Sequence, residues 1–266
     1  MSKIKYTLKI LFLFASSIAC SSSDPQESSP NVSQDASISA NHEEDIEQST
    51  SEFNPANCPE SAVEVPIDMS IAKFVDYLNS LPKPLTASCL LHYLPKPLLV
   101  DATSDEVSAQ PAVGRQNPRL FFKVGKLYIS IALTNTGSQR LEISEIVSET
   151  RAVKAEIGFP RNNQLAESQP YQRARLNERG TTCSICHSGE TEAGEGFPLG
   201  AFESDMVRPI PRLDVTLNDL KRLAQSCTVQ DLGGKLRCEI LDIITAENAA
   251  IPYEFSTVIP TRDDEF

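Results

Sequence analysis

Two cysteines and a histidine lie close together in the C-terminal half of the chain, as Cys183-Ser-Ile-Cys186-His187. This C-x-x-C-H spacing is typical of covalent haem attachment, in which two thiols bond the porphyrin vinyl groups and the imidazole becomes the proximal iron ligand. In a helical segment the three side chains would share one face, because residues three and four positions apart are neighbours. We therefore expect one covalent haem c on Cys183, Cys186 and His187.

Two other chemistries are compatible with the same residues. A C-x-x-C pair can be a redox-active dithiol, although the βαβ pattern of thioredoxin-like proteins does not surround it here. Zinc could bind Cys183, Cys186, His187 and a further thiol, but no second C-x-x-C pair is present.

The sixth iron ligand is a separate question. Met206 is the only Met or His after His187 and precedes two prolines, so we predict it as the ligand, although the spacing of 19 residues is short. A packing role for Met206, ligation by His92, and an open sixth position are the alternatives. Three arginines could pair with the haem propionates: Arg179, Arg208 and Arg212.

The N-terminus has the features of an export signal. Three lysines precede an apolar run, and small residues end it at Ser17-Ile18-Ala19-Cys20. This ending resembles the lipobox of bacterial lipoproteins, which implies removal of residues 1–19 and lipidation of Cys20. Ser21 at the next position favours the outer membrane; an ordinary secreted protein is the alternative. No later apolar run is long enough to span a membrane.

Residues 20–57 form an acidic, Ser-rich segment. It contains eight acidic residues and neither Lys nor Arg. This composition predicts a disordered tether, in which His42 is a solvated side chain. Removal of residues 1–19 takes away three lysines and changes the net charge from −12 to −15. Such a charge disfavours nucleic acid and suits a basic redox partner protein.

Four cysteines remain for disulfides in an oxidising compartment. Proximity in the sequence favours Cys58–Cys89 and Cys227–Cys238, although four cysteines allow three pairings.

Periodicity divides the rest of the chain into helical and extended parts. Helical patterns cover 70–81, 216–227 and 235–244, with one or two turns in 86–93. Alternating apolar residues predict an antiparallel β meander, with one wet face, from strands at 98–100, 119–124, 126–133, 140–147 and 153–157. We read residues 188–200 as a loop.

The lipobox and the haem motif together resemble a bacterial lipoprotein with a single-haem cytochrome c-like domain. The resemblance implies an α+β chain with a signal peptide (1–19), a tether (20–57), an α+β domain with an antiparallel sheet (58–160) and a small, mainly α cytochrome c-like haem domain (161–266). It implies one-electron transfer in the cell envelope, with the lipid anchor as the only membrane attachment. A partner- or ligand-binding lipoprotein with a sensing or structural haem, and a peroxidase-type enzyme, are the alternatives.

Overall fold

The computed structural model describes residues 53–134, 137–229 and 232–261. The predicted signal peptide, Cys20, His42 and most of the tether lie outside this range. Within the described residues, no helix is long and apolar enough to cross a membrane.

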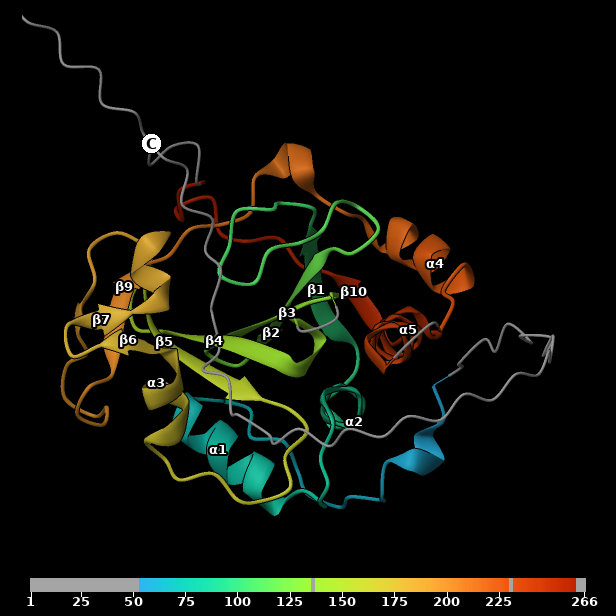
Figure 1. Ribbon diagram of the computed structural model, residues 1–266, viewed down its shortest axis with the longest axis horizontal. Coiled ribbons are helices and arrows are strands. Elements are labelled where there is room, and N and C mark those ends of the chain that lie inside the picture. The colour runs from blue at the N-terminus through green and yellow to red at the C-terminus, as the bar shows by residue number, and fades with distance from the viewer. Residues whose placement is uncertain (1–52, 135–136, 230–231, 262–266) are drawn as a thin grey trace, which may run out of the picture.

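One eight-stranded sheet forms the centre of the molecule (Figure 1), in the order β10-β1-β2-β3-β4-β5-β9-β8. Its strands are β1 (Leu98–Thr103), β2 (Arg119–Val124), β3 (Leu127–Ala132), β4 (Arg140–Ile146), β5 (Arg151–Gly158), β8 (Thr191–Glu192), β9 (Phe202–Asp205) and β10 (Ala250–Pro252). All pairs are antiparallel except β1 with β10, which is parallel. A separate hairpin pairs β6 (Arg175–Asn177) with β7 (Gly180–Thr181).

Alternation along β2 and β4 separates the two faces of the sheet. Leu120, Phe122, Leu141 and Ile143 are almost wholly buried in the main hydrophobic core, which the period of two places on one face. The residues that alternate with them, such as Arg119, Phe121 and Glu142, point to the opposite face. The sheet therefore has an apolar face and a face that carries charged and aromatic side chains.

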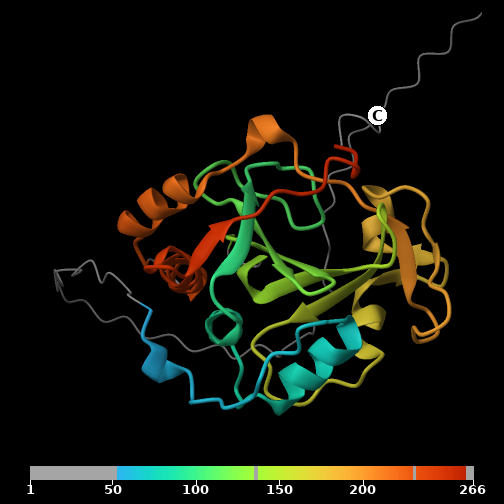
Figure 2. The ribbon, with the colours of Figure 1, turned by 180° about the vertical axis from the view of Figure 1, so that it is seen from behind.

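Helices cover the apolar face. Figures 1 and 2 place α1 (Ile71–Ser80) and α2 (Ala87–Tyr93) on one side of the sheet, and the loop 104–118 on the other. The side chains of Ser70 and Thr86 cap the first turns of α1 and α2 and accept hydrogen bonds from Lys73 N and Cys89 N, as polar N-cap residues do. The predicted helix at 70–81 and the helical turns at 86–93 are therefore confirmed.

The other helices lie near the ends of the sheet. They are α3 (Gln169–Ala174), α4 (Leu217–Gln225) and α5 (Leu232–Thr245), with 3₁₀ turns η1 (Pro55–Asn57), η2 (Gly137–Gln139), η3 (Thr182–Ile185) and η4 (Pro211–Leu213). Thr216 and Asp219 form a reciprocal capping box at the start of α4. The two helices predicted around 216–227 and 235–244 are α4 and α5.

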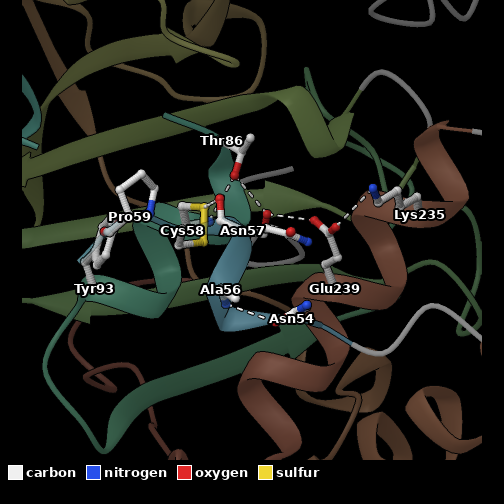
Figure 3. The surroundings of a disulfide bond; sticks show 11 residues. Asn54, Ala56, Asn57, Cys58, Pro59, Thr86, Tyr93, Lys235 and Glu239 are labelled. Carbon is white, nitrogen blue, oxygen red and sulfur yellow. Dashed lines mark hydrogen bonds and ion pairs between the residues drawn. A yellow bond between two sulfur atoms is a disulfide. The ribbon is translucent and has the colours of Figure 1, made fainter. Parts of the chain in front are cut away.

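Both predicted disulfides are present. Cys58–Cys89 joins the segment after η1 to α2, and Cys227–Cys238 joins the end of α4 to α5. Figure 3 shows Thr86 and Glu239 near the Cys58–Cys89 disulfide. Ser88 Oγ lies 3.0 Å from Thr86 Oγ1 and donates to Glu239 Oε2 at 2.8 Å. The disulfide therefore fixes the N-terminal segment to α2, and the hydrogen bond from Ser88 connects α2 to α5.

The predicted fold class is wrong in its C-terminal half. The five predicted strands are present as a meander, but residues after 161 do not form a small helical cytochrome c-like domain. They add β8, β9 and β10 to the same sheet, so the protein is rich in β-structure, with some helices. These strands are only two to four residues long, too short for alternation to be visible in the sequence.

Candidate functional site

A cavity lies over the polar and aromatic face of the sheet, and the C-x-x-C-H motif forms part of its wall. Its interior volume is about 120 Å³. Its floor comes from β2 to β5, and its other walls come from the loop after β1, the motif, residues 206–209 and the C-terminal segment near Phe255.

The motif adopts a tight turn at η3 that directs its functional groups to this cavity. The amide groups of Cys186 and His187 both donate to the Cys183 carbonyl, at 3.0 and 2.9 Å. Thr181 caps the turn with its hydroxyl, which accepts from Cys183 N at 3.1 Å. Cys183, Cys186 and His187 all line the cavity, and neither thiol is in a disulfide. The structure thus brings the three predicted haem-binding residues together.

A backbone hydrogen bond fixes the orientation of the His187 ring. Nδ1 lies 2.8 Å from the carbonyl oxygen of Asp205 in β9, and this carbonyl can only accept, so Nδ1 carries the proton. Nε2 is therefore the nitrogen with a free lone pair. Histidines that bind metals commonly have their second ring nitrogen held in this way.

Side chains around Asp205 hold the turn that follows the motif. Arg151 donates to Asp205 Oδ1 at 2.8 Å, to Glu203 Oε1 at 3.1 Å and to the Gly189 carbonyl at 2.9 Å. Ser188 Oγ donates to Asp205 Oδ2 at 3.0 Å. These contacts connect the residues after His187 to both β5 and β9.

Burial controls the protonation of the motif. It lowers the pKa of His187 to about 3, with a further contribution from the positive charge of Lys154, so the ring is neutral near pH 7. Burial, together with the negative charge of Glu142, raises the pKa of the Cys183 thiol to about 11. The folded chain thus presents a neutral imidazole and a neutral thiol.

Three charged side chains on the sheet lie within the cavity wall. Arg119 forms an ion pair with Glu142 and donates to Ser130 Oγ at 2.7 Å. Lys154 is 4% exposed, and its Nζ lies 3.3 Å from Ser144 Oγ. In the described part of the chain, no carboxylate lies within ion-pair distance of Lys154. Burial lowers the pKa of the Lys154 amine.

The rest of the wall is mainly apolar. Met206 is 5% exposed and packs in a small cluster with Tyr128, Ala152 and Ile259. Phe255 stacks on Tyr128, with ring centroids 4.7 Å apart.

The other predicted site residues have different positions. Met206 and Arg208 line the cavity, whereas Arg179 and Arg212 do not. His92 lies away from it in α2, where its ring is 5.3 Å from that of Phe53. The sequence prediction missed Arg119 and Lys154, because charged residues that alternate along a strand resemble those of a solvent face. Only the cover formed by distant loops shows that Lys154 is buried and that Arg119 is partly buried.

The donor set is the one that a covalently attached haem requires: two thiols and a neutral imidazole with a free Nε2 face one cavity. Over residues 53–134, 137–229 and 232–261, no group of three or more His, Cys, Asp and Glu side chains could hold a metal ion. No known protein family, curated protein or solved structure matches the chain.

Proposed function

We propose that this chain carries one covalent haem c in the cavity over the sheet and acts as a one-electron carrier in the bacterial cell envelope. The observation that carries the proposal is the convergence of Cys183, Cys186 and His187 on that cavity, with His187 Nδ1 bonded to Asp205. When bound, the haem would supply the iron couple Fe(II)/Fe(III).

Each residue of the motif has a distinct role in this proposal. Cys183 and Cys186 would hold the haem by addition of each S–H group across one vinyl group, with no atom lost and no net oxidation or reduction. His187 would offer Nε2 to the iron, and the Asp205 carbonyl holds the ring and increases its basicity. The apolar cluster around Met206 and Tyr128 would influence the redox potential of a haem bound there.

The attachment is tested on the full chain produced in a bacterium with a c-type haem maturation system. We expect a covalent haem band on a denaturing gel and a thioether-haem spectrum in alkaline pyridine. Cys183→Ala with Cys186→Ala should abolish covalent haem, whereas Cys227→Ala with Cys238→Ala, away from the cavity, should retain it. Absence of covalent haem in the unmodified chain would contradict the proposal.

The envelope location is a second part of the proposal and depends on Cys20. Lipidation of this cysteine would anchor the protein, because several acyl chains give stable membrane attachment. Ser21 at the next position favours the outer membrane as the site. We expect Cys20→Ala to move the protein from the membrane fraction to the soluble fraction. An unchanged distribution would argue against the lipid anchor.

The net charge suggests the kind of redox partner. A chain with 36 acidic and 24 basic residues attracts a basic protein, and salt weakens such an attraction. The rate of electron transfer to a basic acceptor protein should therefore fall as ionic strength increases.

A further inference from the structure

Met206 is joined by one peptide unit to the carbonyl that holds His187, and this limits where its sulfur can reach. The Asp205 carbonyl oxygen lies 2.8 Å from His187 Nδ1. With standard bond lengths and a fully extended side chain, the distance from this oxygen to Met206 Sδ is at most about 7 Å.

A sixth ligand opposite His187 would have to lie farther away. Such a ligand would be separated from the Asp205 carbonyl oxygen by the hydrogen bond, the width of the imidazole and two metal–ligand bonds of about 2 Å each. These lengths add to a distance of at least about 8 Å. Met206 Sδ cannot meet this distance while the bond between His187 and Asp205 is intact. Its position in the cluster with Tyr128, Ala152 and Ile259 instead gives it a packing role.

The other described side chains that bind iron strongly are also committed elsewhere. Met69 is fully buried in the main core, and His92 lies in α2 beside Phe53. Tyr128 Oη is hydrogen-bonded to Tyr253 Oη at 2.8 Å, and Glu142 is paired with Arg119. Lys154 Nζ is directed to Ser144 Oγ on the neighbouring strand.

We infer that no side chain of residues 53–134, 137–229 and 232–261 occupies the sixth position of the iron, and that this position binds a small exogenous ligand of two or three atoms, with Lys154 as the hydrogen-bond donor for an anionic one. The inference rests on the proposed haem. Lys154 is suited to this role because it is buried in the cavity wall without a carboxylate partner in the described chain. An open sixth position would give the proposed electron carrier a ligand-binding site. Ligand binding there would then control electron transfer.

The test uses purified haem-loaded protein, its covalent haem content first measured in denaturant so that failure of the proposed function is recognised separately. We expect the reduced protein to bind carbon monoxide and the oxidised protein to bind azide. Met206→Leu should leave both spectra and both affinities unchanged. Lys154→Met should weaken azide binding about tenfold or more, with carbon monoxide binding retained. Lys123→Met, on the same face of the sheet outside the cavity lining, is the control.

Three results would overturn the inference. The first is a reduced protein that contains covalent haem but does not bind carbon monoxide. The second is loss of a sulfur-to-iron charge-transfer band in Met206→Leu, which would identify Met206 as the ligand. The third is carbon monoxide binding that appears only in Lys154→Met, which would identify Lys154 as the sixth ligand.

Discussion

At the scale of single residues, the turn after His187 depends on a glycine. Gly189 has a φ of +63°, a conformation that residues with a side chain rarely adopt. A Cβ at this position would lie 2.6 Å from Asp205 Oδ2. The turn that connects His187 to Asp205 thus requires both the conformation and the small size of glycine.

Gly189→Ala should therefore destabilise the protein by more than about 1 kcal/mol, because strain at positive φ adds to the close approach of Asp205. Gly194→Ala is the matched control: no atom lies within 4 Å of its Cβ position, and its φ is not in the left-handed region. Urea unfolding of both variants measures the difference. Equal midpoints would show that the turn tolerates a side chain.

At the scale of secondary-structure elements, Arg151 joins β5 to β9 and to the turn after the motif. Its guanidinium contacts two carboxylates, the Gly189 carbonyl and Thr191 Oγ1 in β8. The side chain is only partly exposed, so solvent screens these contacts less than those of a surface pair. The short strands β8 and β9 are thus held by this side chain in addition to their few backbone bonds.

Arg151→Ala should lower the free energy of unfolding by about 1–3 kcal/mol and reduce the fraction of chains with covalent haem. Arg173→Ala is the control, since Arg173 bonds a single carboxylate, Glu156, and is more exposed; its effect should stay below about 1 kcal/mol. Thermal unfolding and haem content of both variants provide the comparison. If both variants behave alike, Arg151 does not position the motif.

At the scale of the whole molecule, the sheet carries a partly buried acid whose protonation affects global stability. Burial, together with the charges of Asp214 and Glu254, raises the pKa of Asp101 in β1 to about 7. In the unfolded chain the same group ionises near pH 4. Between these values the folded state binds more protons than the unfolded state, so stability decreases as pH rises from about 4 to about 7.

Asp101→Asn should remove this part of the pH dependence, so that its stability falls less than that of the unmodified protein between pH 5 and pH 8. Asp76→Asn, at an exposed position of α1, should keep the original dependence. Urea midpoints at the two pH values measure the effect. The same fall in Asp101→Asn as in the unmodified protein would exclude Asp101 as its source.

Local sequence patterns were sufficient to predict the helices and strands that show a clear helical or alternating period. The strand at 119–124 and the capped helix after Ser70 could be predicted because short-range spacing determines them. Both disulfides join the cysteines that are nearest in the sequence, which is the pairing that proximity favoured among the three possible. The motif residues could also be identified, since three adjacent functional groups need no knowledge of the fold. The burial of Lys154 and the positions of β9 and β10 could not, because they depend on pairing with distant parts of the chain.

The parallel pairing of β10 with β1 joins an early and a late segment of the chain in one sheet. Leu98 pairs with Ala250, so the sheet is complete only after almost the entire chain has been synthesised. The Phe255 wall of the cavity follows β10 directly and is made at the same late stage. An enzyme that attached the proposed haem would therefore meet Cys183 and Cys186 before the last segment covers them.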